Sequence, residues 1–243
     1  MINKLEEIIN ESDNIVFFGG AGVSTESGIP DFRSQDGLYN LKYDYPPEEI
    51  LSDFFFYNKP REFYKFYFDK LVNLDIKPNY THIFLKKLED MNKLKAIVTQ
   101  NIDGLHEMAG SKKVYTIHGN INTYHCIMCG KEYKLSAIMK MKELPICECG
   151  NLIKPDVVLY GEALPNDVFE GAIKAISEAD TLIVGGTSLT VFPASSLINY
   201  FHGKHLIIIN RDHLNVDCEL QINDSIGETF KKINLRWLYG INS

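Results

Sequence analysis

The sequence predicts an α/β protein with a doubly wound, parallel, Rossmann-like sheet and an inserted small lobe. Short apolar runs of strand length recur along the chain, and amphipathic stretches with helical spacing lie between or beside them. Two segments of different composition interrupt this alternation. With 243 residues, 45% of them hydrophobic and 23% charged, the chain has an ordinary globular composition and can bury a large core.

The elements follow in order along the chain. Residues 1–7 mix charges with apolar side chains at helical spacing and are neither a secretory signal nor an Arg-rich transit peptide. No apolar run approaches the roughly 20 residues that span a bilayer, so we expect no membrane partner. The predicted strands are Ile15–Phe18, Ala96–Thr99, Thr181–Val184 and His205–Ile209, and the predicted helices include Tyr80–Asn92 and Asp167–Glu178.

Four cysteines are spaced as metal ligands. Cys126-x-x-Cys129 and Cys147-x-Cys149 are 17 residues apart, and a glycine that permits a tight turn follows each pair. Two such thiolate pairs suit one tetrahedral structural Zn²⁺ with no open position for catalysis. His125 is the one nearby substitute ligand, and a surface role is the simpler interpretation. Since Cys218 stands alone, no disulfide framework is indicated, and we expect a cytoplasmic protein.

The two interrupting segments predict the domain organisation. Residues 41–79 are rich in aromatic side chains with helical character, and residues 120–154 hold the clustered cysteines. We expect a helical module at 41–79 and a zinc-binding module at 120–154, which together form the small lobe. Residues 1–40, 80–119 and 155–243 would form the nucleotide-binding domain. Ligands usually bind between such lobes, at the carboxyl ends of the parallel strands.

The densest motif is the run from Gly19 to Ser34, directly after the first predicted strand. Its glycines would let main-chain N–H groups approach a diphosphate, and a following helix N-terminus would favour the negative charge. A glycine turn can also serve sterics alone. A dinucleotide-binding dehydrogenase would place a third glycine at Thr25 and continue into an apolar helix. The polar loop that follows here argues against a simple dehydrogenase.

Polar residues also follow the other predicted strands. Thr99–His106 contains Asn-x-Asp-Gly, which on its own is compatible with a plain turn. Gly185–Leu189 and Asn210–Asp212 place small polar groups at two further strand ends, where an adenosine ribose and a diphosphate need them. His118 ends an apolar run before Gly119, and an imidazole with an ordinary pKa near 6.5 is a natural general base. His82 and His106 are expected to be structural.

Taken together, these motifs resemble those of the sirtuins, the silent-information-regulator family of NAD-dependent protein deacylases, in a bacterial-like single-domain form. The resemblance covers nearly the whole chain and is loosest over residues 41–79. It implies an NAD-dependent protein-lysine deacetylase that releases nicotinamide and 2′-O-acetyl-ADP-ribose. The Cys147-x-Cys149 pair departs from the two Cys-x-x-Cys pairs that are usual in the family.

The resemblance also implies residue roles. His118 would be the catalytic base and Asn101 a second catalytic residue. Asp103 and the Ile102 main chain would contact the nicotinamide carboxamide, and Phe32 and Arg33 would shield the sugar and order the loop. The cofactor-binding residues implied are Gly20, Ala21, Gly22, Thr25, Phe32, Arg33, Gln100, Ile102, Asp103, Gly186, Thr187, Ser188, Asn210, Arg211, Asp212 and Ile226.

The run Lys154–Glu162 resembles the sirtuin loop that pairs with an extended acetyl-lysine peptide by strand addition. Val158, Tyr160, Gly161 and Glu162 are therefore the expected substrate-binding residues, and the Val158 carbonyl would accept the Nε hydrogen. Family members that prefer acidic acyl groups pair a tyrosine with an arginine three residues later. Tyr64 fits the first position, but Tyr67 stands at the second, which predicts a bias against succinyl groups.

Alternatives remain open. An ADP-ribosyltransferase or a longer-chain deacylase would use the same NAD site. A non-catalytic NAD sensor is opposed by the presence of both His118 and Asn101. The net charge of −7 disfavours direct nucleic-acid binding and favours a basic peptide as partner.

Overall fold

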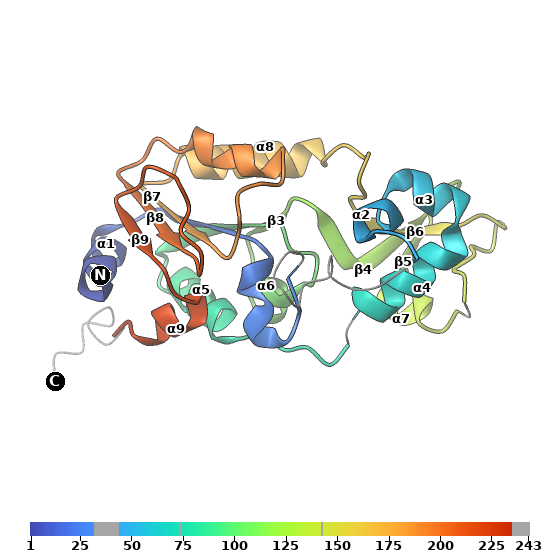
Figure 1. The fold of residues 1–243 in the computed structure, drawn as a ribbon, viewed down its shortest axis with the longest axis horizontal. Coiled ribbons are helices and arrows are strands. Elements are labelled where there is room, and N and C mark those ends of the chain that lie inside the picture. The colour runs from blue at the N-terminus through green and yellow to red at the C-terminus, as the bar shows by residue number, and fades with distance from the viewer. Residues whose placement is uncertain (32–43, 73, 142, 235–243) are drawn as a thin grey trace.

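The computed structural model describes residues 1–31, 44–72, 74–141 and 143–234 (Figure 1). In these ranges, six parallel strands form one sheet in the order β3-β2-β1-β7-β8-β9. Because the strand order reverses between β1 and β7, the loops after these strands diverge and open a crevice at the carboxyl edge. The strands are β1 (Ile15–Gly19), β2 (Leu94–Thr99), β3 (Val114–Thr116), β7 (Thr181–Gly185), β8 (His205–Ile209) and β9 (Leu220–Ile222).

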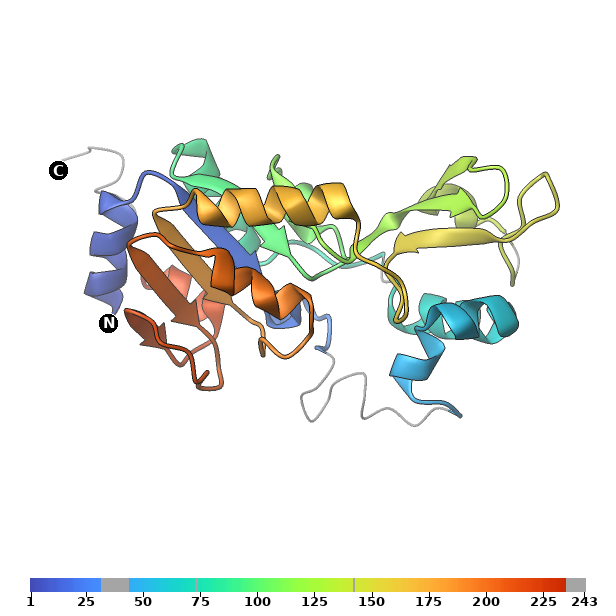
Figure 2. The same cartoon turned by 90° about the horizontal axis from the view of Figure 1, so that it is seen from above.

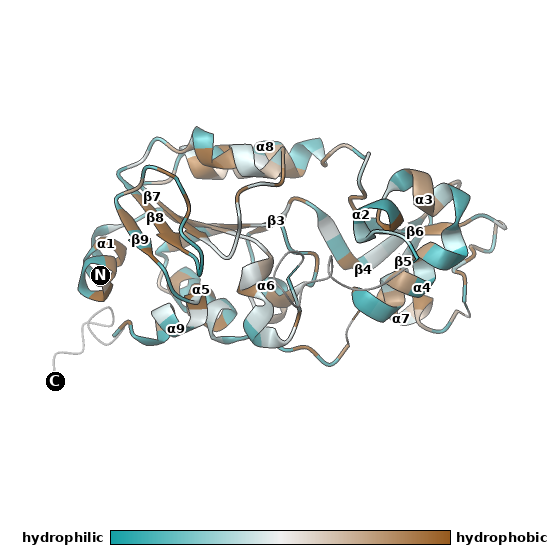
Figure 3. Cartoon of the chain, viewed as in Figure 1, coloured by the Kyte–Doolittle hydropathy of each residue, from teal (hydrophilic) through white to brown (hydrophobic). Residues whose placement is uncertain are grey.

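The predicted doubly wound parallel sheet is confirmed, and the four strands expected from apolar runs each match to within two residues. Figure 3 shows the basis of these runs, since the central strands β7 and β8 are mostly hydrophobic. Both faces of these strands are covered, which removes the polar alternation of a half-exposed sheet.

Different helices cover the two faces of the sheet (Figure 2). Phe17 points into one core cluster, while its neighbours Val16 and Phe18 point into the other, as the strand period of two requires. The first cluster is closed by α1 (Ile2–Glu11), α5 (Tyr80–Asp90) and α9 (Ile226–Lys231). The second is closed by α8 (Asn166–Ser177) and the 3-10 helix η4 (Ala194–Tyr200).

Helix α5 shows how local sequence sets an element's bounds. The Asn79 side chain accepts a hydrogen bond from Thr81 N, and His82 Nδ1 accepts one from Asn79 N, which forms a capping box at the helix start. The helix ends at Asp90, two residues before the predicted end. Asn92 adopts a left-handed φ of 57°, which an asparagine tolerates and which cannot continue a helix.

The small lobe combines two segments that are distant in the sequence. Helices α2 (Pro47–Ile50), α3 (Asp53–Asn58) and α4 (Pro60–Lys70) pack against an antiparallel sheet of order β5-β4-β6, with α7 (Leu135–Ile138) beside it. Its strands are β4 (Gly119–Cys126), β5 (Glu132–Lys134) and β6 (Ile153–Val157). We propose the division into 1–40, 80–119 and 155–243 against 41–79 and 120–154 as the domain organisation.

Aromatic side chains form the centre of the small lobe. Tyr64, Tyr67 and Tyr124 are each fully buried. The Tyr64 hydroxyl donates to the Ile153 carbonyl, and the Tyr67 and Tyr124 hydroxyl oxygens lie 3.4 Å apart. The helices are therefore tied to the sheet by polar contacts as well as by apolar packing. Among the described helices, none is both long and apolar enough to cross a membrane.

Candidate active site

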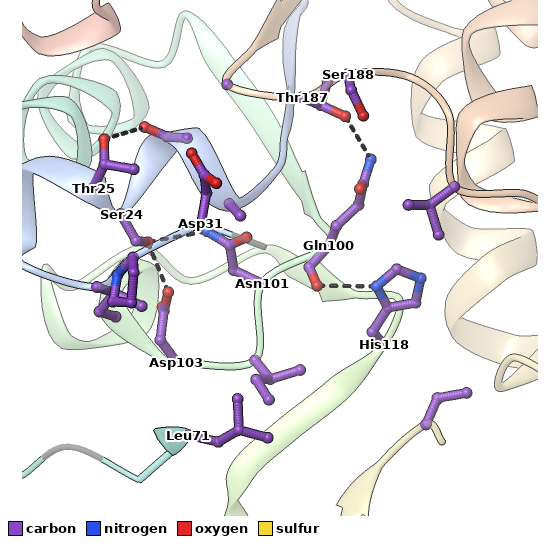
Figure 4. Close-up of a pocket in the computed structure, with 18 of the residues that line it drawn as sticks. Ser24, Thr25, Asp31, Leu71, Gln100, Asn101, Asp103, His118, Thr187 and Ser188 are labelled. Carbon is purple, nitrogen blue, oxygen red and sulfur yellow. Dashed lines mark hydrogen bonds between the residues drawn. The ribbon is translucent and has the colours of Figure 1, made fainter. Parts of the chain in front are cut away.

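A cavity of about 750 Å³ opens at the carboxyl ends of β1, β2, β7 and β8 and reaches the small lobe (Figure 4). Its volume is in the range of small-molecule and cofactor sites. Nearly all the described residues that the sequence predicted for the site line this one cavity: Ala21, Gly22, Thr25, Gln100, Asn101, Ile102, Asp103, His118, Val158, Tyr160, Gly161, Glu162, Gly186, Thr187, Ser188, Asn210, Arg211, Asp212 and Ile226.

Gly20 is an exception, because it was expected to contact the cofactor and does not line the cavity. A β-carbon on Gly20 would lie 2.8 Å from Cβ of Thr187 and 2.9 Å from the Gly186 carbonyl oxygen. The residue is glycine so that the loop after β1 can pack on the loop after β7. Phe32 and Arg33, two further predicted cofactor residues, lie outside the described residues.

The loop after β1 is built differently from the expected helix start. It forms two 3-10 turns, η1 (Ala21–Val23) and η2 (Thr25–Ser27), and it is fixed from two sides. Gly22 N donates to the Gly186 carbonyl at 2.8 Å, and Asn79 Nδ2 donates to the Val23 carbonyl at 2.7 Å. The short turns bend the chain back into the cavity, and Ser24, Thr25 and the Ile29–Asp31 segment line its wall.

A polar network joins the loops after β1 and β2. The Ser24 hydroxyl donates to Asp103 Oδ2 at 2.7 Å, and Asn101 Nδ2 donates to the same hydroxyl oxygen at 3.0 Å (Figure 4). Burial raises the pKa of Asp103 above its ordinary value, and the hydrogen bonds from Leu105 N and Ser24 oppose that rise. The network holds a carboxylate and an amide side by side in a largely buried wall, where they can bind an amide or a sugar hydroxyl.

His118 lies at the end of the segment that leads into β4. Its Nδ1 is 3.0 Å from the Gln100 carbonyl oxygen. Because a carbonyl only accepts, Nδ1 carries the proton, and Nε2 is left as the basic nitrogen. Burial lowers the pKa of His118 below 6.5, and the hydrogen bond to Gln100 offsets part of this lowering. The imidazole is thus neutral at physiological pH and able to accept a proton.

The carboxyl ends of β7 and β8 complete the nucleotide side of the cavity. Gln100 Nε2 donates to Thr187 Oγ1 at 3.2 Å, which links the β2 and β7 loops. Gly186 has a φ of 60° and a β-carbon there would lie 2.5 Å from Val23 N, so the position requires glycine. Asn210 Nδ2 donates to the Asp212 carbonyl at 3.0 Å and shapes the loop after β8.

The segment after β6 forms the opposite wall. Val158 N donates to the His118 carbonyl at 2.9 Å, so this segment and the histidine hold each other in place. Glu162 Oε2 accepts from Leu159 N at 2.8 Å and lies 2.9 Å from Lys154 Nζ. The Glu162 carboxylate is therefore engaged in closing the turn, although the residue lines the cavity as predicted.

The predicted acyl-selecting pair lies elsewhere. Tyr64 and Tyr67 are fully buried in the small-lobe core and are not among the residues that line the cavity. Their hydroxyl groups contact Ile153 and Tyr124 instead, because the apolar face of α4 packs on the sheet. Helix α4 reaches the cavity through its C-terminal end, at Lys70 and Leu71. The bias against acidic acyl groups stays a prediction, and neither tyrosine contributes to the wall of the cavity.

Several lining residues were missed by sequence reasoning. Ser24 lies in the first motif, between the predicted cofactor residues Gly22 and Thr25, and this position could have marked it as a site residue. Leu51, Lys70 and Leu71 come from the segment where the resemblance is loosest, so nothing in the sequence marked them. The loop after β7 adds Val191, Phe192 and Pro193, and α9 is preceded by Asp224 and Ser225.

The four predicted metal ligands meet at the far end of the small lobe. The Sγ atoms of Cys126, Cys129, Cys147 and Cys149 all lie within 4.8 Å of one another. Bonds of about 2.3 Å to a tetrahedral zinc ion would separate the sulfurs by about 3.8 Å. The separations of 3.4 Å for Cys126–Cys149 and 3.6 Å for Cys129–Cys147 are close to that value, so the thiolates fit the ion.

The surroundings of the cysteines also suit a metal. Gly130 and Gly150 have φ values of 68° and 85°, as the two tight turns require. The Tyr133 hydroxyl donates to Cys147 Sγ at 3.1 Å, an outer contact that favours a thiolate. His125 Nδ1 instead lies 2.7 Å from Asp156 Oδ1, and the residue is not part of the cluster. The shortened Cys147-x-Cys149 spacing thus still brings both sulfurs to one point.

Comparisons with known proteins agree with this geometry. A sequence model of the Sir2 family matches residues 20–193. An NAD-dependent protein deacetylase of Clostridium perfringens (strain 13 / Type A) is 56% identical over 238 residues, covering 96% of this chain and 98% of that protein.

Solved structures of Sir2 proteins are also similar to this chain. A structure of Sir2 with a p53 peptide and NAD⁺ has a TM-score of 0.87 at 38% identity, with 99% of both chains covered. A structure of Sir2Tm bound to a propionylated peptide has a TM-score of 0.86 at 37% identity, again with 99% of both chains covered. The similarity extends over nearly the full length of each of these proteins.

Proposed function

This chain belongs to the Sir2 family, and on that premise we propose that it is an NAD-dependent protein-lysine deacetylase that releases nicotinamide and 2′-O-acetyl-ADP-ribose. NAD is its co-substrate, and the four-cysteine cluster suits a structural zinc ion. The family assignment rests on similarity over the whole chain. The residue roles are those that the resemblance implies, and their support is that the residues line one cavity.

The observation that carries the mechanism is the placement of His118. Its Nδ1 proton is committed to the Gln100 carbonyl, and its Nε2 has no hydrogen-bond partner among the described residues. Asn101 and Asp103 line the same cavity. A neutral imidazole in such a wall is suited to take a proton from a ribose hydroxyl, while the neighbouring amide and carboxylate orient the sugar and the leaving group.

NAD, when bound, supplies an electrophilic anomeric carbon with nicotinamide as its leaving group. We assign the nicotinamide carboxamide to Asp103 and the Ile102 main chain. The Ile102 carbonyl accepts from Ile121 N at 3.0 Å, which fixes this part of the loop. The diphosphate and adenosine are assigned to the residues that end β1, β7 and β8 and to Ile226, all of which line the cavity.

The acylated substrate is assigned to the segment Val158–Glu162. The main-chain carbonyl of Val158 accepts no hydrogen bond from the described part of the chain. It is therefore free to accept the Nε hydrogen of an acetyl-lysine whose stem lies beside Val158 and Tyr160. An extended peptide would then lie beside this segment, in the cavity that Val191–Pro193 also lines.

A basic stretch of protein is the expected form of substrate, because the chain has a net charge of −7. We also propose a cytoplasmic location, since the thiolates of the cysteine cluster need a reducing compartment to remain metal ligands.

The test is incubation of the protein with NAD and an acetyl-lysine peptide. We expect free nicotinamide and a peptide lighter by one acetyl group, in equal amounts. Mass spectrometry of the peptide also separates the alternative, because an ADP-ribosyltransferase would make the peptide heavier. Nicotinamide release without loss of acetyl would contradict the deacetylase assignment.

A further inference from the structure

We propose that Asp53 is a specificity-determining residue that favours substrates with a lysine or arginine close to the acetyl-lysine. The inference rests on the proposed function, since it concerns the same cleft and the same peptide. It goes further by assigning a sequence preference to one carboxylate that lies against Gly161, a residue of the cavity wall. The sequence alone did not mark this residue as part of the site.

The main chain at Asp53 is attached directly to the substrate-binding segment. Asp53 N donates to the Tyr160 carbonyl at 3.0 Å, and Tyr160 N donates to the Leu51 carbonyl at 2.9 Å. Ser52 and Tyr160 form a parallel bridge. The start of α3 therefore lies alongside Tyr160 as a short partner strand, and its position follows that of the cavity wall.

The side chain of Asp53 lies against the next residue of that wall, Gly161. A β-carbon built on Gly161 would lie 2.5 Å from Asp53 Oδ1 and 3.1 Å from Oδ2. Gly161 lines the cavity and has a φ of 98°. Only a glycine allows a carboxylate to approach the main chain so closely, so the negative charge lies next to the assigned path of the substrate backbone.

The charge at Asp53 is not neutralised within the protein. Its Oδ1 accepts from Phe54 N at 2.6 Å, and among the described residues no lysine, arginine or histidine forms an ion pair with it. Glu162 differs, because Lys154 Nζ lies 2.9 Å from its carboxylate. Asp53 is also not needed as the helix cap, since Ser52 Oγ accepts from Phe55 N.

An extended peptide advances about 3.3 Å per residue, and a lysine or arginine stem is longer than that step. A cation one or two residues from the acetyl-lysine can therefore reach Asp53. The pair would be partly exposed, so we expect it to change kcat/KM by roughly two- to fivefold, the range of surface ion pairs. Salt should weaken the preference, because partly exposed charges are screened.

The experiment compares two acetyl-lysine peptides that differ only in carrying arginine or glutamine beside the acetyl-lysine. The wild type should prefer the arginine peptide in kcat/KM, and Asp53→Asn should abolish the preference while retaining the hydrogen bond from Phe54 N. Asp53→Lys should reverse the preference when a glutamate peptide replaces the glutamine peptide. Glu178→Gln is the matched control, because it also removes one exposed carboxylate. Glu178 is the C-cap residue of α8, just before β7 begins, and thus lies at the end of the sheet away from the cavity.

The outcomes separate this inference from the function on which it rests. Turnover of both peptides with an unchanged ratio in Asp53→Asn would overturn the role of Asp53 and leave the deacetylase assignment intact. An equal shift in Glu178→Gln would attribute the preference to overall charge and would likewise overturn it. No nicotinamide release from either peptide would overturn the proposed function, and this inference with it.

Discussion

Ser24 and Asp103 are 79 positions apart in the sequence, yet the Ser24 hydroxyl donates a 2.7 Å hydrogen bond to Asp103 Oδ2. This bond joins the loop after β1 to the loop after β2 and is formed in a wall buried enough to raise the pKa of Asp103. A buried carboxylate that loses a hydrogen bond is left with an uncompensated desolvation cost. The serine therefore helps to hold the aspartate in place at the site.

Ser24→Ala should weaken NAD binding by roughly tenfold or more, since the lost bond is one to a charged group. The pKa of Asp103 should rise further, because one of the two hydrogen bonds that lower it disappears. The measurement is KM for NAD at several pH values. Ser177→Ala serves as control, because that hydroxyl donates only to the Lys174 carbonyl within α8, and an equal loss there would contradict a specific role for Ser24.

His118→Ala should retain NAD binding and lose deacetylation by roughly 10² or more, the scale of general-base removal. Binding can be followed by calorimetry and turnover by nicotinamide release. Unchanged turnover would remove His118 from the mechanism.

The pH dependence of kcat/KM tests the protonation state of the same residue. Since burial lowers the pKa of His118 below 6.5, the reactive neutral form persists as the pH falls past that value. Activity should be constant around neutral pH and fall only when the pH drops through the lowered pKa. An acidic limb with a midpoint above 6.5 would contradict the buried environment that the structure gives this imidazole.

Stability should fall in mild acid because of His82 and His106, whose ring centroids lie 4.7 Å apart in the core beneath the site. Burial lowers the pKa of His82 to about 4 and that of His106 well below 6.5. Below pH 6.5 the unfolded chain binds protons that the folded protein excludes. The stability is thus fully present above 6.5 and is lost as the pH falls toward 4, by about 3 kcal/mol for His82 alone.

Urea denaturation at about pH 7.5 and pH 5.5 measures this loss. His106→Leu should reduce the difference between the two pH values, because a buried group that binds a proton only when unfolded has been removed. His202→Gln is the control, since His202 is exposed and should leave the difference unchanged. Equal pH dependence in the wild type and in His106→Leu would show that the buried pair does not control acid stability.

Replacement of Cys126 or Cys147 by alanine should release zinc and destabilise the small lobe, because a structural ion supplies folding energy and both cysteines also belong to the buried cluster of that lobe. Activity should be lost too, since β4 runs from the metal site to Gly119, next to His118. Metal analysis of the wild type should find about one zinc per chain. A zinc-free, folded and active protein would contradict the four-thiolate assignment.

The parts of the fold that could be predicted from sequence are those where a local pattern decides the structure. The buried strands are uninterrupted apolar runs, and the cysteine pairs carry their turn glycines with them. The small antiparallel sheet was not predicted, because its strands carry polar residues and because β4 pairs with the distant strand β6, as Tyr124 does with Pro155.

How far the site residues could be predicted from the sequence also depends on whether a local pattern decides their position. Motif residues at strand ends converge because parallel strands share an edge, and the sequence shows which residues end a strand. Gly20 stays a predicted cofactor residue that packs against the loop after β7, and sequence alone does not separate ligand approach from loop packing at a glycine. The direction of the α4 side chains depends on which face packs on the sheet, so the sequence places Tyr64 and Tyr67 on a small-lobe helix but does not show that they point away from the cavity.

The construction of the small lobe from two separate segments sets the order of events during synthesis. Tyr64 emerges 89 positions before Ile153, the residue whose carbonyl its hydroxyl contacts. At synthesis rates of about 5–20 residues per second, the strands that cover the aromatic helices are synthesised roughly 4 to 18 s after those helices. During that interval the apolar face of α4 has no native partner, so the nascent chain exposes its most aromatic surface before it can fold.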